Sequence, residues 1–92
     1  MIKSFRNAAA EAAWQRRFIK GVPDDILKIA NRKLTQIQNA RDNDLRIPPG
    51  NRLEALSGSR KGQHSMRIND QWHICFRWQD GDAHDVEIVD YH

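Results

Sequence analysis

The spacing of hydrophobic positions at the start of the chain predicts a helix. From Ala8 to Lys20 the sequence is rich in alanine, and Trp14 and Phe18 are four residues apart, as on one face of a helix. Gly21 is expected to end this helix in a left-handed conformation, and Pro23 prevents its continuation. The preceding residues, Lys3 to Phe5, could form a short edge strand.

A second helix is predicted to begin at Asp24. The carboxylates of Asp24 and Asp25 lie where the free N–H groups and the helix dipole favour negative charge. Apolar residues then recur at spacings of four, four and three, which is typical of a helix with one buried face. Lys28, Arg32 and Lys33 point away from that face, which consists of Ile26, Ala30, Leu34 and Ile37. We expect two antiparallel amphipathic helices.

Beyond Pro48-Pro49-Gly50 the hydrophobic period shortens to two, which indicates strands. Apolar and polar residues alternate from Ser65 to Trp78, with a turn signal at Asn69-Asp70. A two-residue loop there would place charged residues opposite apolar ones. We therefore expect a three-residue loop, Asn69 to Gln71, which pairs Ile68 with Trp72 and Met66 with Ile74.

A further turn at Asp80-Gly81-Asp82 leads into a last predicted strand, Ala83 to Tyr91. Val86 and Ile88 can join the apolar layer of the preceding strand, opposite Phe76 and Ile74. The predicted fold class is α+β, with two helices packed on one face of a small twisted antiparallel sheet.

The other face of this sheet is expected to gather polar groups. Arg67, His73 and Arg77 follow one another on it, with Asp85 opposite Arg77 and Tyr91 diagonal to His73. Arg77 and Asp85 could be only a cross-strand ion pair. A single β-bulge would change the assignment of these faces.

Length and composition narrow the class of protein. A chain of 92 residues is expected to form one domain, residues 1–92, and 39% hydrophobic with 29% charged residues is typical of a folded protein rather than a disordered one. No apolar run is long enough to span a membrane, and we expect no signal peptide. Cys75 is the only cysteine, so an internal disulfide is excluded and a cytoplasmic location is expected.

Positive charge is concentrated in the first half of the chain. Residues 1–46 hold 10 Lys and Arg against 5 Asp and Glu, a net charge of +5, whereas residues 47–92 hold 5 against 7, a net charge of −2. This excess fits a polyanion-binding surface and equally fits ordinary solvated helix faces.

The polar groups suit the cleavage of RNA. That reaction needs a base for the 2′-OH, cations for the anionic transition state and an acid for the leaving oxygen. The candidate groups are Arg52, Arg60, Lys61, Arg67 and Arg77, with Asp90-Tyr91-His92 at the end of the chain. Trp72 and Trp78 are assigned to the core rather than to base stacking, and no metal site is predicted.

Three stretches carry a resemblance to a known family. The opening Ile2-Lys3-Ser4-Phe5, the stretch PPGNRLEALSGSRKGQHSMRINDQWHICFRW and the ending GDAHDVEIVDYH resemble the HigB-type toxins, or plasmid maintenance killer proteins, of the RelE superfamily. The resemblance covers nearly the whole chain. Its most specific parts are Asn69 to Trp78 and the terminal Asp90-Tyr91-His92.

This resemblance implies a toxin of a type II toxin–antitoxin system whose open, concave sheet face enters the ribosomal A site and cuts mRNA there. The cut would be a metal-independent attack by the 2′-OH, with no cofactor. The resemblance implies that Asp90, Tyr91 and His92 form the catalytic end of the chain, and His73 on the predicted open face is the further catalytic candidate. The candidate RNA-binding residues are Arg52, Arg60, Lys61, Arg67, Gln71 and Arg77.

The resemblance also implies partners. One is the 70S ribosome with its mRNA and ribosomal RNA. The other is a HigA-type helix-turn-helix antitoxin, and the toxin would bind operator DNA only through this antitoxin.

The chain departs from the family pattern at three positions. Glu54 and Ser57 stand where members often have His and Lys, and His73 stands where Arg is frequent. Arg60 and Lys61 could replace the missing positive charge. Two alternatives follow: a module that binds the ribosome or the antitoxin without efficient cleavage, and an RNA- or DNA-binding domain that needs no ribosome.

Overall fold

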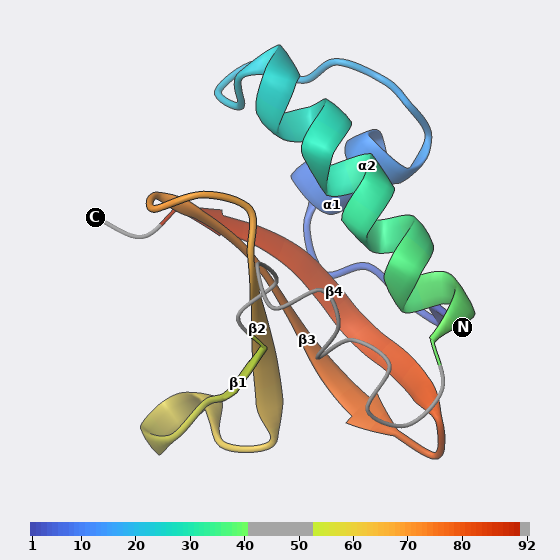
Figure 1. The fold of residues 1–92 in the computed structure, drawn as a ribbon, viewed down its shortest axis with the longest axis vertical. Helices are drawn as coiled ribbons and strands as arrows, with labels where there is room; N and C mark the ends of the chain where they lie inside the picture. The colour runs from blue at the N-terminus through green and yellow to red at the C-terminus, as the bar shows by residue number, and fades with distance from the viewer. Residues whose placement is uncertain (41–52, 91–92) are drawn as a thin grey trace.

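The computed structural model describes residues 1–40 and 53–90, and in these ranges it contains a helical layer and one sheet. In chain order the elements are α1 (Ala8–Trp14), α2 (Asp24–Asn39), β1 (Glu54–Ala55), the 3-10 helix η3 (Gly58–Arg60), β2 (Gln63–Arg67), β3 (Trp72–Gln79) and β4 (Asp82–Asp90). The strands are antiparallel in the order β1-β2-β3-β4, and both helices lie on one side of the sheet, nearest β4 (Figure 1). The expected α+β fold is confirmed.

The first helix is shorter than predicted. It begins as expected, because the side chain of Asn7 accepts a hydrogen bond from the Ala10 N–H and caps the helix. It ends at Trp14 rather than Lys20, and Arg16 adopts a left-handed conformation with φ of 58°. The predicted common face of Trp14 and Phe18 is therefore wrong: Trp14 packs against the core, whereas Phe18 is 66% exposed.

The second helix agrees with the pattern that predicted it. It starts directly after Pro23 with Asp24 and Asp25 in its first turn, and Gly21 before it has a φ of 96°. The whole apolar stripe is buried against the sheet, together with Leu27: Ile26, Ala30, Leu34 and Ile37. Burial of this stripe fixes the helix on the apolar face.

The predicted register between β2 and β3 is confirmed. Met66 lies opposite Ile74, and the Ile68 N–H donates to the Trp72 carbonyl at 2.9 Å across a three-residue loop. The side-chain oxygen of Asn69 accepts hydrogen bonds from the backbone N–H groups of Gln71 and Trp72, both at 2.8 Å. Asn69 thereby stabilises the loop that sets which side chains face the core.

The predicted register between β3 and β4 is correct only at one end. Ile74 lies opposite Ile88 as expected, but a β-bulge falls between Cys75 and Arg77. The bulge gives β4 one residue more than β3 in this interval, so Arg77 lies opposite His84 and not opposite Asp85. Asp85 itself has a left-handed φ of 53°. Val86 nevertheless stays in the buried apolar layer.

The N-terminal segment lies beside β4. Isolated parallel bridges join Ile2 to Ala83 and Phe5 to Val86, so the expected edge strand is present only as these two contacts. The core lies between this layer of helices and the sheet, with Phe76, Leu34 and Ile37 among its largest fully buried side chains. In the described ranges neither helix has the length and apolar character needed to cross a bilayer.

Candidate functional site

A hollow of about 170 Å³ opens on the polar face of the sheet, where β1, β2 and β3 meet the loop between β2 and β3. Its lining combines one imidazole, one guanidinium, one hydroxyl and two carboxylates: Glu54, Ser65, Arg67, Asp70 and His73.

The strand register brings these side chains together. Arg67 lies opposite His73, and Glu54 lies opposite Ser65, so each pair occupies one side of the sheet. Their neighbours Met66 and Ile74 point to the other side and are buried in the core. The hollow is thus on the face opposite the packed helices.

His73 is held in an environment that favours its neutral form. Its Nδ1 lies 3.3 Å from the hydroxyl oxygen of Ser65, which is almost fully buried. Partial burial and the nearby positive charge of Arg67 lower the pKa of His73 below its ordinary value of 6.5, although Glu54 acts in the opposite direction. A neutral imidazole at neutral pH is able to accept a proton.

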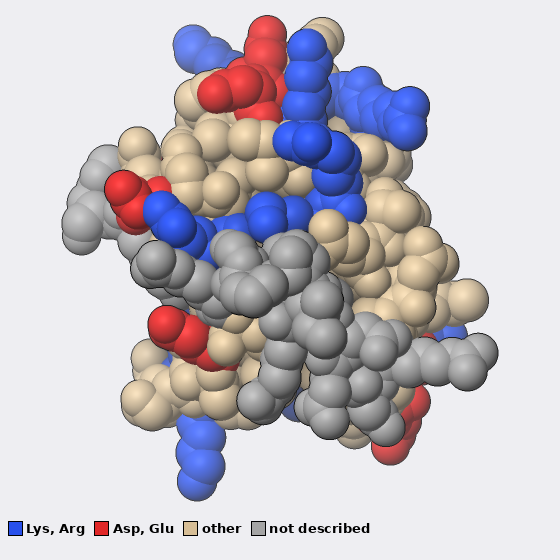
Figure 2. All heavy atoms as spheres, viewed as in Figure 1, with Lys and Arg blue, Asp and Glu red and all other residues tan. Residues whose placement is uncertain are grey.

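Arg67 is the cation of the hollow. It forms an ion pair with Asp70, whose side chain is 96% exposed, and this exposure makes the pair easy to exchange for another anion. Burial, followed by the positive charges of Arg32 and Arg67, lowers the pKa of Lys33 of α2, so the ammonium group of Lys33 is within electrostatic reach of Arg67. In Figure 2 most Lys and Arg side chains on the visible face gather in the half that contains the helices in Figure 1.

Arg60 does not supply free positive charge to the hollow. Its guanidinium donates to the buried carboxylate of Glu87 at 2.6 Å and to Gln63 at 3.0 Å. Arg6 lies 3.5 Å from the other oxygen of Glu87. The proposed replacement of the missing cation by Arg60 therefore does not fit its contacts, and Lys61 next to it is simply exposed.

Of the remaining predicted site residues that the structure describes, not all share the polar face. Arg77 lies 3.7 Å from Asp85 in a half-exposed ion pair, so the expected contact survives the change in register. Gln71 is exposed in the loop after β2. Asp90 ends β4 opposite the core residue Trp72, so strand alternation places it on the side away from His73. Arg52, Tyr91, His92 and the Pro48–Gly50 break lie outside the described residues.

The sequence prediction missed part of the lining. Ser65 and Asp70 were not assigned to the site, and Glu54 was noted only as a departure from the family pattern. Ser65 had a usable signal, because it is two residues before Arg67 on one strand and therefore shares its face.

The hollow brings together the parts of a proton-transfer site. A neutral imidazole can take a proton, and an arginine next to it can stabilise the negative charge that develops on a phosphate. Two carboxylates reduce the positive potential of the hollow, so an anionic ligand must displace Asp70 from Arg67 to bind there.

Comparison with known sequences identifies relatives along the whole chain. The family described as RelE-like toxin of type II toxin–antitoxin system HigB matches residues 3–92. Toxin HigB-1 of Vibrio cholerae serotype O1 is 46% identical over 63 residues, which are 67% of this chain and 66% of that protein. Endoribonuclease HigB of Proteus vulgaris is 29% identical over 92 residues and is covered completely, as is this chain.

Solved structures share the fold at low sequence identity. The YoeB-YefM complex from Staphylococcus aureus contains a chain with a TM-score of 0.65 and 17% identity, and the match covers 100% of this chain and 98% of that one. YafQ from E. coli has a TM-score of 0.61 and 15% identity, with 98% and 93% covered. At these identities the likeness concerns the fold alone.

Proposed function

Because the chain belongs to the family of RelE-like HigB toxins of type II toxin–antitoxin systems, we propose that it is an endoribonuclease that cuts mRNA on the ribosome and so arrests translation. The observation that carries the proposal is the pairing of His73 with Arg67 in a hollow on the sheet face away from the packed helices. The name of the Proteus vulgaris relative, an endoribonuclease, supports the same activity.

In the proposed reaction neutral His73 accepts the proton of a ribose 2′-OH. The resulting oxygen attacks the adjacent phosphorus, the bond to the 5′-oxygen breaks, and a 2′,3′-cyclic phosphate forms. Arg67 binds the non-bridging oxygens as negative charge develops on them, after Asp70 has been displaced. The leaving 5′-oxygen takes its proton from His92 or Tyr91, and Asp90 orients one of these groups. The step uses side chains alone and no cofactor.

The proposal includes the ribosome because the hollow is small and carries two carboxylates beside its arginine. Affinity for free RNA is therefore expected to be low. A ribosome can hold the mRNA in the cleavable geometry and thereby replace the missing binding energy. The further proposed contacts to RNA are Arg52, Lys61, Gln71 and Arg77.

As the partner of this toxin we propose an antitoxin of the HigA type, with a helix-turn-helix domain that carries the complex to operator DNA. The toxin chain itself is not expected to read DNA sequence.

Primer extension on an mRNA translated by purified components tests the proposal. The wild-type protein is expected to produce new 5′ ends, and His73→Ala is expected to reduce their rate of formation by about 10²- to 10⁴-fold, the usual contribution of a general base. His84→Gln is the matched control, because His84 lies on the same sheet but does not line the hollow. Equal cleavage by the wild type and His73→Ala would exclude His73 as the base.

Two further experiments test the dependence on the ribosome and the role of His92. Omitting ribosomes should abolish cleavage, and cleavage of naked RNA at the same rate would exclude ribosome dependence. Deleting His92 should slow the reaction if that residue protonates the leaving oxygen. Full activity without His92 would indicate that Tyr91, and not His92, protonates the leaving oxygen.

A second function is favoured by the charge of the hollow. Glu54 and Asp70 together outweigh Arg67, which would suit a protein that occupies the ribosome or its antitoxin and cuts RNA only weakly. In that case the wild-type protein would sediment with ribosomes and inhibit translation without producing new 5′ ends.

A further inference from the structure

A second and larger concavity lies in the helical layer, away from the hollow. It is a groove of about 580 Å³ between the chain that follows α1 and the first half of α2. Four cationic side chains share its lining with apolar groups and one amide: Ala13, Arg16, Arg17, Phe18, Leu27, Lys28, Asn31 and Arg32. The reaction described above uses none of these residues.

The early end of α1 creates this groove. Arg16 takes a left-handed backbone conformation, which is unfavourable for a residue with a Cβ and turns the chain away from the helix axis. Asn31 of α2 stabilises the turn, because its side-chain amide donates to the carbonyls of Ala13 at 2.9 Å and Trp14 at 3.4 Å. A helix continued to Lys20 would have no such turn, so the groove depends on it.

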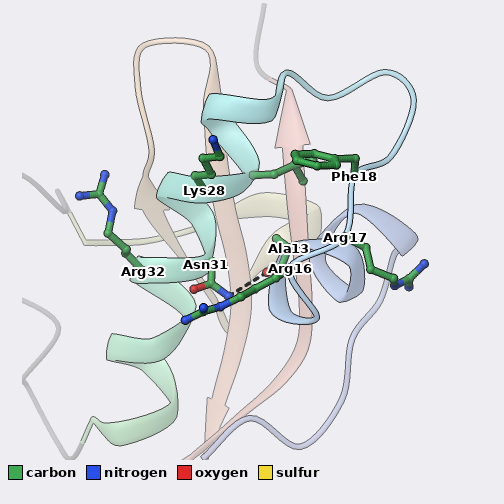
Figure 3. Close-up of a pocket in the computed structure, with 8 residues that line it drawn as sticks. Ala13, Arg16, Arg17, Phe18, Lys28, Asn31 and Arg32 are labelled. Atoms are coloured by element: carbon green, nitrogen blue, oxygen red, sulfur yellow. Dashed lines mark hydrogen bonds between the residues drawn. The ribbon is translucent and has the colours of Figure 1, made fainter.

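Phe18 gives the groove an apolar anchor point. Its side chain is 66% exposed, which is unusual for an aromatic residue of a folded protein, and it lines the same space as Leu27 and Ala13. Figure 3 shows the Phe18 ring turned toward α2 from the loop after α1. Water covers apolar surface here that a partner side chain could bury.

Cations surround this apolar floor. Within residues 1–40 and 53–90, Arg16, Lys28 and Arg32 take part in none of the ion pairs. Arg17 points away from α2 in Figure 3, and its Nε donates to the side chain of Gln15 at 2.7 Å. The groove thus presents unneutralised positive charge next to apolar surface, a combination that fits an acidic segment bearing an apolar side chain.

We propose that this groove is the docking site for an acidic peptide segment of the antitoxin, which inserts a leucine or aromatic side chain beside Phe18 while its carboxylates pair with Arg16, Lys28 and Arg32. The assignment to the antitoxin rests on the proposed function. An RNA base could stack on Phe18, but the aliphatic groups of Ala13 and Leu27 beside it favour an apolar peptide side chain over RNA. Charge complementarity then selects an acidic peptide.

Fluorescence anisotropy with short synthetic peptides tests the proposal on the full chain. The probe is a glutamate-rich peptide that contains leucine and phenylalanine, and its control has serine at the apolar positions. We expect the first to bind and the second to bind roughly ten- to a hundredfold more weakly, because an apolar side chain is no longer buried. Equal binding of the two peptides would overturn the proposal.

Variants locate the binding. Phe18→Ala should weaken binding by a similar factor, and Phe18→Leu should restore much of it. Lys28→Gln and Arg32→Gln should each weaken it by about two- to fivefold, with the effect decreasing at high salt. Lys3→Gln removes an exposed cation that does not line the groove and should change nothing. Binding unaffected by Phe18→Ala would place the peptide elsewhere.

Two comparisons separate this proposal from its rival and from the proposed function. If a short single-stranded RNA displaces the peptide at equal concentration, the groove is an RNA-binding surface and the proposal is wrong. Phe18→Ala should retain the cleavage rate of the wild type, since Phe18 lies outside the hollow. If the wild-type protein binds the peptide but does not cleave mRNA, the proposed nuclease activity is wrong and the proposed docking site is not affected.

Discussion

His73 owes its character to its partial burial in the hollow and to the charges beside it. Burial has the largest effect on the pKa of this imidazole and lowers it, the positive charge of Arg67 lowers it further, and the negative charge of Glu54 raises it. A base is most useful when its pKa lies near the working pH, because its neutral form is then populated while the group is still basic enough to take a proton. The residue that departs from the family pattern at this position is thus suited to accepting a proton.

Opposite shifts are expected when the two charges are removed. Arg67→Gln should raise the pKa of His73, because protonation no longer opposes a neighbouring cation, and Glu54→Gln should lower it. An NMR pH titration of the imidazole C–H signals measures both, with the His84 signals as an internal control. If the pKa of His73 is the same in both variants as in the wild type, the charges of Arg67 and Glu54 do not influence the imidazole.

At the scale of single elements, contacts with other elements decide where α1 ends. The alanine-rich stretch ends at Trp14. The next residues, Gln15, Arg16 and Arg17, still have good helix propensity, yet the chain turns at Arg16. The amide of Asn31 occupies the carbonyls of Ala13 and Trp14, and so compensates for hydrogen bonds that a longer helix would have made. The backbone N–H groups of Arg16 and Arg17 also donate locally, to the Ala13 and Ala12 carbonyls at 3.2 and 2.8 Å, so the tertiary hydrogen bonds add to a local cap.

Asn31→Ala should therefore destabilise the protein. We expect a loss of about 1 kcal/mol in the free energy of unfolding, the usual net contribution of such hydrogen bonds. Asn39→Ala is the matched control, since Asn39 donates only within its own helix, to the Thr35 carbonyl. Urea denaturation compares the two, and equal stability of both variants would show that the contact between the helices contributes nothing.

At the scale of the whole molecule, one buried carboxylate joins distant parts of the chain. Glu87 of β4 binds Arg60 from η3 and Arg6 from the N-terminal segment. These contacts lie on the polar face of the sheet, where Glu87 is opposite Cys75. The network connects β4 with the N-terminal segment and with η3, which lies between β1 and β2 in the chain.

Removing this carboxylate should cost more than removing an exposed one. Glu87→Gln is expected to lower the free energy of unfolding by about 1–2 kcal/mol, a moderate value because both arginines are partly exposed. Asp85→Asn, which weakens the half-exposed pair with Arg77, should cost less than about 1 kcal/mol. Thermal and urea unfolding of the two variants test the difference, and a larger loss in Asp85→Asn would contradict it.

Local signals in the sequence were sufficient for much of the fold. The apolar stripe of α2, the start of each helix and the loop at Asn69 depend on neighbours within a few residues, so periodicity and turn chemistry predict them. The register of that loop also placed Arg67 and His73 on one face. The resemblance to a family then connected this face to RNA.

Only the tertiary structure decided the rest. The end of α1, the bulge at Asp85, the pairing of Arg60 with Glu87 and the place of Glu54 in the hollow all depend on residues far apart in the sequence. Such contacts form when the helices pack on the sheet, and no periodicity along the chain records them. The residues were therefore visible in the sequence, whereas their partners, and with them their charge and chemistry, were set by packing.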